Sequence, residues 1–218
     1  MKPLIFLNFK AYEQGTAGNA ERLAVIAGKV AKEKMAEVIL IVQNSDIFRV
    51  SQKVGIPVYA QHADEEGYGS RTGHEVLEVL KANGASGVML NHSECRIPME
   101  KIKKVIERCR EVGMAVLVCA PSVEDAVEIS KLEPDYVAYE DPELIGSGKS
   151  VTEYSPKAVE DFVEKVKGFS AVPLCGAGIS TGEDVKAAVK LGTKGVLLAS
   201  GFVKAEDPEK VLLGLVGE

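Results

Sequence analysis

Residues 136–148 read YVAYEDPELIGSG, and this stretch indicates the fold of the whole chain. An apolar, β-prone run from Tyr136 to Tyr139 ends in the carboxylate of Glu140, and a proline and two closely spaced glycines follow. This order is typical of a buried strand that delivers an acid to a loop. A lone glutamate at a strand end is most often a solvated surface residue. Glu140 is therefore a candidate for a functional role only if other strands also end in reactive side chains.

Apolar runs of the same kind recur along the chain and alternate with helical patterns. Most of them are nearly continuous in Val, Leu and Ile, as expected for a parallel sheet that is covered on both faces or closed on itself. The runs span residues 4–10, 37–43, 57–61, 87–92, 115–120, 136–140, 173–177 and 195–200.

The helices predicted between these runs have recognisable ends. Pro98 begins one whose apolar residues share a single face, and Gly113 ends it. Ser180 and Glu183 have the spacing of a capping box at the start of another, which ends at Gly192. Further helices are expected over residues 19–35, after Ser155-Pro156 and after Asp207-Pro208.

Eight strand–helix units without a linker or a repeat array predict a closed (β/α)₈ barrel that forms a single domain over residues 1–218. An open, doubly wound sheet is the alternative. It usually has fewer strands and a glycine fingerprint after the first strand, where this chain has Asn8-Phe9-Lys10-Ala11. Because such barrels typically need about 250 residues, several helices or loops are expected to be short.

The composition, 46% hydrophobic and 27% charged, is that of an ordinary globular protein. A net charge of −6 without a basic block gives no support to nucleic-acid or membrane-surface partners. The first apolar run is too short for a signal peptide, and none approaches the ~18 residues of a membrane span, which favours a cytoplasmic protein. The four cysteines lack C-x-x-C spacing, so we expect small buried residues instead of disulfides or a zinc site.

In such a barrel the carboxyl ends of all strands open onto one face. Asn8 and Lys10 end the first run on the same side of the strand, His92 ends the fourth with Glu94 two residues later, and Glu140 ends the sixth. Each has an ordinary structural interpretation: a solvated strand end for Lys10, a hydrogen-bonded core histidine for His92, and a partner of Lys10 or of a neighbouring chain for Glu94. Their convergence at one rim favours a functional site.

Two other histidines and two glycine-rich segments lie near the same rim. His62 and His74 follow the third run, and the sequence indicates no chemical role for them. Residues 175–180 and 195–201 leave the seventh and eighth strands, which is the usual phosphate site of these barrels because free N–H groups and a helix N-terminus favour an anion. One such segment would more often be a tight turn, but two at adjacent strand ends favour phosphate binding.

A carboxylate, an imidazole and an ammonium group beside a phosphate site fit proton abstraction next to a carbonyl, with no cofactor or metal. Glu140 would take the C–H proton, His92 would polarise the carbonyl and shuttle protons, and Lys10 would stabilise the enediolate. Residues 141–149 would close over the site, exclude water and prevent loss of phosphate from a phosphorylated triose.

Taken together and in order, residues 8–10, 91–94, 139–148, 175–180 and 195–201 resemble triosephosphate isomerases of the short archaeal form, over essentially the whole chain. The resemblance implies interconversion of dihydroxyacetone phosphate and glyceraldehyde 3-phosphate in glycolysis and gluconeogenesis. It also implies Glu140 as base and neutral His92 as electrophile, a pairing already known for this family. The substrate-binding residues that it implies are Asn8, Phe9, Lys10, Ile145, Gly146, Gly178, Ala199, Ser200 and Gly201.

The resemblance also implies a homo-oligomer, since short archaeal members are typically homotetramers and longer members are dimers. Residues 69–73 resemble the family's third loop, which reaches into a neighbouring subunit, so Thr72 is expected near the partner's active site. The chain departs from the family at three positions. Cys95 stands where arginine is common, residues 42–44 replace an Ala-Pro run, and Asp141 replaces the proline after the base, which could loosen the first hinge of the loop.

Two other functions stay open at this stage. One is a different phosphate-binding barrel enzyme, such as a synthase of tryptophan or prenyl-lipid metabolism, which would not need Lys10, His92 and Glu140 together. The other is a catalytically silent phosphosugar-binding barrel, in which Glu140→Asp would change nothing. If the chain is an isomerase, shortening the base by one methylene in Glu140→Asp should lower kcat strongly with little change in substrate binding.

Overall fold

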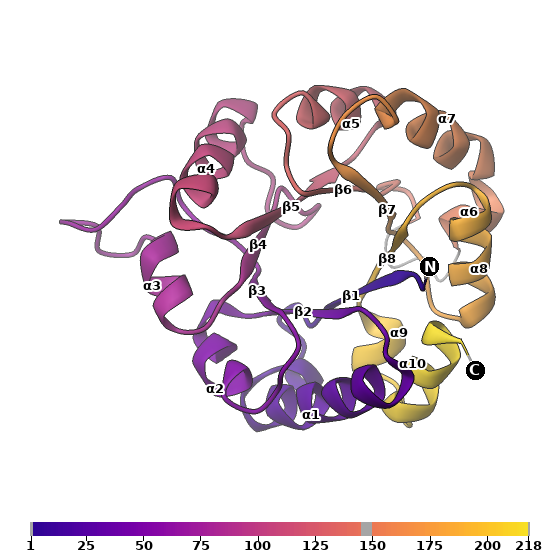
Figure 1. Ribbon diagram of the computed structural model, residues 1–218, viewed down its shortest axis with the longest axis horizontal. Helices are drawn as coiled ribbons and strands as arrows, with labels where there is room; N and C mark the ends of the chain where they lie inside the picture. The colour runs from indigo at the N-terminus through magenta and orange to yellow at the C-terminus, as the bar shows by residue number, and fades with distance from the viewer. Residues whose placement is uncertain (1, 145–149, 218) are drawn as a thin grey trace.

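The computed structural model describes residues 2–144 and 150–217, and they form a closed barrel of eight parallel strands (Figure 1). Each strand pairs with the next along the chain, and β1 closes the barrel on β8, with Leu4 opposite Gly195. The predicted (β/α)₈ barrel is confirmed, and the open-sheet alternative is wrong. The strands are β1 (Leu4–Asn8), β2 (Val38–Val42), β3 (Val58–Ala60), β4 (Gly87–Leu90), β5 (Ala115–Ala120), β6 (Tyr136–Tyr139), β7 (Val172–Cys175) and β8 (Gly195–Leu198).

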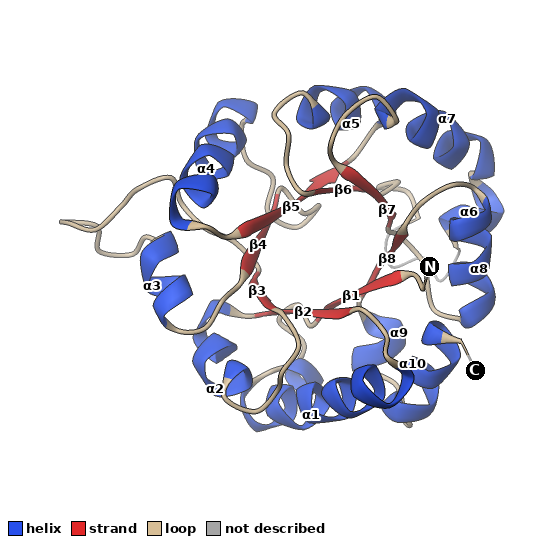
Figure 2. Cartoon of the chain, in the orientation of Figure 1, coloured by secondary structure: helices blue, strands red, loops and turns tan. Residues whose placement is uncertain are grey.

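Helices surround this barrel on its outside, as Figure 2 shows. Two of them, α2 and α3, have only 5 and 6 residues, which is how the short chain completes the ring. None of the described helices is long and apolar enough to cross a membrane. The helices are α1 (Ala17–Lys34), α2 (Ile47–Ser51), α3 (Leu77–Ala82), α4 (Met99–Val112), α5 (Val123–Ser130), α6 (Val151–Tyr154), α7 (Pro156–Val166), α8 (Gly182–Lys190), α9 (Ser200–Val203) and α10 (Pro208–Val216), with 3₁₀ turns η1 (Glu13–Gly15) and η2 (Asn44–Asp46).

One predicted helix end is displaced by a residue. The capping box of α8 joins Thr181 and Asp184, whereas the sequence pattern predicted Ser180 and Glu183. The Thr181 hydroxyl accepts the N–H of Asp184 at 3.2 Å, and the Asp184 carboxylate accepts the N–H of Thr181 at 2.9 Å. Glu183 instead pairs with Lys186 on the helix surface at 2.7 Å. Aspartate completes the box because its shorter side chain still reaches back to the first turn.

The strands are apolar throughout because both of their faces are buried. Along β1, Ile5 and Leu7 pack against the helices while Phe6 points into the barrel, where its ring lies 5.8 Å from that of Tyr59 and 5.0 Å from that of Tyr136, both edge-on. Side chains thus fill the barrel interior, as is usual for this fold.

The cysteines are free thiols, but they do not share one environment. Cys109, Cys119 and Cys175 are buried, as the sequence predicted, and burial raises the pKa of each thiol. Cys95 is exposed, so the expectation of four buried cysteines is wrong at this position. It lies in the loop between β4 and α4.

Candidate active site

A cavity of about 280 Å³ lies at the carboxyl ends of the strands and collects most of the predicted site residues. Asn8 and Lys10 reach it from β1, His92 from β4 and Glu140 from β6, which the sequence predicted from their places at strand ends. Most of the rest of its wall comes from the glycine-rich residues 175–180 and 195–201. The further lining residues are Tyr12, Ala177, Gly178, Ile179, Ser180, Leu197, Leu198, Ala199, Ser200 and Gly201.

Glu140 is a buried carboxylate held at the first position after β6. Its residue is 4% exposed, and its backbone N–H donates to the carbonyl of Ala120 at 3.0 Å. Its Oε1 lies 3.7 Å from Nε2 of His92, and its Oε2 has no hydrogen-bond partner within residues 2–144 and 150–217. Gly176 leaves room for this side chain, because a Cβ there would lie 2.6 Å from Cγ of Glu140.

His92 has its two ring nitrogens in different roles. Nδ1 accepts the backbone N–H of Glu94 at 3.2 Å, which leaves Nε2 to carry the proton and face Glu140. Burial lowers the pKa of His92, and it outweighs the opposing effect of Glu140; Lys10 lowers this pKa further. The ring is therefore a neutral hydrogen-bond donor beside a carboxylate.

Lys10 enters the cavity from an unusual backbone conformation. Its φ is 49°, in the left-handed region, and its N–H donates to Oδ1 of Asn8 at 3.0 Å. Its ammonium group lies 2.7 Å from Oε1 of Glu94, so of the two structural roles expected for Glu94 the pairing with Lys10 is observed. The Lys10 side chain is only 11% exposed and lines the cavity, whereas the Glu94 side chain is 60% exposed and is not among the described residues of the cavity wall. Lys10 therefore places a positive charge at the cavity wall.

The two glycine-rich segments approach each other closely on the other side of the cavity. A Cβ on Gly201 would lie 3.1 Å from Cα of Ser180, so the backbones after β7 and β8 are nearly in contact. Ala177 and Gly178 both have left-handed φ values, 69° and 72°. Backbone bends of this kind turn successive N–H groups toward one side, which suits an anion.

One predicted substrate-binding residue that the structure describes, Phe9, does not line the cavity. Phe9 is fully buried among the core residues, where its ring lies 6.2 Å from that of Phe202. Ile145 and Gly146 lie outside the described residues. Conversely, Tyr12 lines the cavity although the sequence analysis did not single it out, and Nζ of Lys204 lies 4.0 Å above its ring. Its place two residues after Lys10 was the signal that could have identified it.

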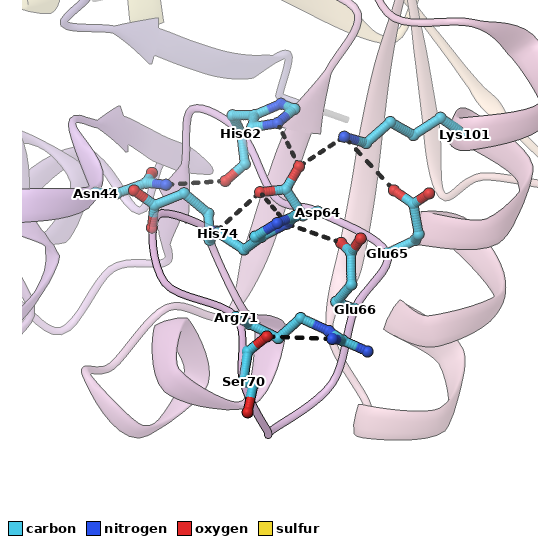
Figure 3. A network of polar contacts seen from close by, with 10 residues as sticks. Asn44, His62, Asp64, Glu65, Glu66, Ser70, Arg71, His74 and Lys101 are labelled. Carbon is cyan, nitrogen blue, oxygen red and sulfur yellow. Dashed lines mark hydrogen bonds and ion pairs between the residues drawn. The ribbon is translucent and has the colours of Figure 1, made fainter.

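His62 and His74 belong to a separate polar cluster around Asp64 (Figure 3). Asp64 lies 2.6 Å from Nζ of Lys101 on α4 and accepts the N–H of Glu75 at 2.9 Å. Burial raises the pKa of Asp64, but these hydrogen bonds outweigh it and bring the value to about 2. Asp64 therefore fastens the base of the β3–α3 loop to α4, and this loop extends outward from the barrel in Figure 1.

These features define a class of protein before any comparison: a (β/α)₈-barrel enzyme that moves a proton on a small phosphorylated substrate. A model of the family described as triosephosphate isomerase matches residues 3–215. The chain is 46% identical to the triosephosphate isomerase of Methanothermus fervidus, covering 100% of this chain and 99% of that protein. It is 43% identical to that of Methanobacterium bryantii, covering 99% and 96%, and 42% identical to that of Methanocaldococcus jannaschii, covering 98% of each.

The chain belongs to the triosephosphate isomerase family. The predicted resemblance is thus confirmed, and with it the prediction of an aldose–ketose isomerase. A synthase of another phosphate-binding barrel family, which the sequence left open, is not supported.

Proposed function

We propose that the chain interconverts dihydroxyacetone phosphate and glyceraldehyde 3-phosphate, with Glu140, His92 and Lys10 as its catalytic residues. The observation that carries these roles is the meeting of the Glu140 carboxylate and the neutral His92 ring, 3.7 Å apart, in a cavity that also holds the Lys10 ammonium group. All three side chains are largely buried, which strengthens their electrostatic effects on a bound substrate.

The reaction is a transfer of protons within one substrate. Glu140 removes a proton from the carbon next to the carbonyl, and the electron pair of that C–H bond forms the enediolate. His92 donates a hydrogen bond from Nε2 to the oxygen where charge develops, and Lys10 stabilises that charge. His92 also carries a proton from the hydroxyl oxygen on the first carbon to the former carbonyl oxygen, which leaves the new carbonyl on the first carbon. Glu140 then returns its proton to the neighbouring carbon, so that nothing is gained or lost overall.

The substrate's phosphate would lie against the backbone of Gly178, Ala199, Ser200 and Gly201, opposite the proton-transfer residues. A cavity of about 280 Å³ suits a substrate of this size. Asn8 would contact the substrate directly, whereas Phe9 would contribute only by packing in the core, against Phe202. The resemblance extends the phosphate site to Ile145 and Gly146 of the closing loop, which the structure does not describe.

The proposal includes an assembly of several copies of the chain, each of which folds as a single domain. Residues 69–73 would insert into a second copy of the chain and bring Thr72 near its active site, and the adjacent Tyr68, which is 71% exposed, would be buried on contact. The proposed assembly is a homotetramer of single-domain chains spanning residues 1–218, acting in the cytoplasm. Light scattering at several protein concentrations would measure its mass directly.

Turnover of glyceraldehyde 3-phosphate in a coupled assay tests the function, with wild type compared with Glu140→Gln. We expect rapid isomerisation by the wild type and a loss of about 10²- to 10⁴-fold in the variant, since an amide cannot accept the proton. Glu160→Gln, an identical change on the exposed surface of α7, is the matched control and should retain full activity. A folded, assembled wild type without turnover would instead support the catalytically silent barrel.

A further inference from the structure

Side-chain amides connect the carboxyl ends of the first three strands just outside the cavity. Gln61, directly after β3, donates from Nε2 to the carbonyl of Lys10 at 3.0 Å, and the same nitrogen lies 3.5 Å from Oδ1 of Asn8. Asn44, after β2, in turn accepts the backbone N–H of Gln61 at 3.1 Å and donates to the carbonyl of His62 at 3.0 Å. The two amides thus form a continuous link from β2 through β3 to β1.

This link supports the backbone of Lys10, which has an unfavourable conformation just after β1. Lys10 lies beyond the last residue of β1 and has a φ of 49°, a left-handed conformation that is unfavourable for an ordinary L-residue. Its N–H donates to Oδ1 of Asn8 and its carbonyl accepts from Gln61. Both polar groups of the Lys10 backbone are therefore held by side-chain amides, and such a conformation persists only where the surroundings fix it.

We propose that Gln61 is a positioning residue that fixes the left-handed backbone of Lys10, with Asn44 supporting Gln61. The inference rests on the proposed role of Lys10 as the substrate-binding cation. Gln61 is not among the described residues that line the cavity, so it acts on the substrate through the residues that it contacts, Lys10 above all and Asn8 beside it. Its position requires a hydrogen-bond donor, because the two atoms that face its Nε2, the Lys10 carbonyl and Asn8 Oδ1, are both oxygens.

The first test replaces Gln61 by methionine, which keeps the length of the side chain but removes the donor. A lost hydrogen bond of about 0.5–1.5 kcal/mol converts to a fall of about 2- to 12-fold in kcat/KM, which we expect in this variant. Asn44→Ala should act in the same direction and more weakly. Ser122→Ala, which removes the N-cap of α5 away from Lys10, is the stability control: it should lower the melting temperature without lowering kcat/KM.

The second test uses pH and separates positioning from a purely structural role. In Gln61→Glu, an ionised carboxylate would face two oxygens and repel them, whereas the protonated acid could again donate to the Lys10 carbonyl. An ordinary glutamate has a pKa of about 4.3, and two facing oxygens raise it, so the kcat/KM of this variant relative to wild type should rise as the pH is lowered from about 7 to about 5. Gln61→Met and Ser122→Ala should show no such trend, because neither side chain titrates.

Lys10→Met distinguishes failure of this inference from failure of the proposed function. If Lys10→Met retains activity, the proposed role of Lys10 is wrong and the inference about Gln61 is wrong with it. If Lys10→Met is impaired but Gln61→Met has wild-type kcat and KM, only the positioning role of Gln61 is refuted. A ratio of Gln61→Glu to wild type that does not change with pH would also refute it.

Discussion

Gly176→Ala should inactivate the enzyme without altering any group that reacts. A Cβ at this position would lie 2.6 Å from Cγ and 3.1 Å from Oε1 of Glu140. Carbon atoms in contact prefer about 3.5–4.0 Å, so the Glu140 side chain must move by about 1 Å. A displacement of that size at a catalytic group costs about 10²-fold, and we expect kcat to fall by about this factor in the coupled assay. KM should change less, since Gly176 is not itself among the described residues that line the cavity.

Gly168→Ala is the matched control, because a Cβ at Gly168 would have nothing within 4 Å. Neither glycine has a φ in the left-handed region, so the two substitutions differ in the contact with Glu140 and not in backbone strain. Circular dichroism and thermal unfolding would show that both variants fold. Wild-type kcat in a folded Gly176→Ala would refute the reasoning, because it would mean that the position of Glu140 does not limit the reaction.

Two further predictions follow from the pKa shifts. The pKa of Asp64 is about 2 in the folded chain and about 3.9 in the unfolded chain. Its ion pair with Lys101 therefore stabilises the fold above about pH 4, and this stabilisation is lost as the pH falls toward 2. Asp64→Asn should thus lower the unfolding free energy by about 1–3 kcal/mol at pH 7, and urea titrations should find the difference from wild type vanishing near pH 2. Because burial lowers the pKa of His92, its ring should stay neutral from about pH 8 to about pH 6.5. Below about pH 6.5 only the unfolded chain binds the proton, so the contribution of His92 to the stability of the fold should decrease there. Ring ¹⁵N shifts of an imidazolium within that range would contradict this.

The eight strands were predictable because burial on both faces leaves an unbroken apolar run. The residue at which each strand ends was harder to predict, because the pattern of apolar residues continues after the backbone has left the sheet. The run predicted over 87–92 ends at Leu90, where Asn91 takes a φ of 57°, and the run over 4–10 ends at Asn8, before Lys10 with a φ of 49°. The predicted strands were thus too long where the backbone bends to present site residues.

The reactive side chains were predictable from the same strand ends, whereas their hydrogen bonds were not. Lys10, His92 and Glu140 all face the cavity, as expected. The tautomer of His92 depends on a backbone N–H two residues away, and the support of Lys10 depends on Gln61, which is 51 residues distant in sequence. Phe9 was placed in the site by resemblance, although the alternation that puts Asn8 and Lys10 on one side of the strand puts Phe9 on the other.

Asp141 shows how a departure from the family pattern can be compensated. A proline at this position would restrict the backbone through its ring, and its absence suggested a looser hinge. In the structure, however, Oδ1 of Asp141 accepts the N–H of Glu143 at 3.0 Å, and Oδ2 accepts the hydroxyl of Ser155 at 3.3 Å. Pro142 adds a restriction of its own on the residue before it. Two hydrogen bonds of about 1 kcal/mol each thus replace the ring, and because such bonds can break and form again, the hinge is held by reversible contacts instead of covalent geometry.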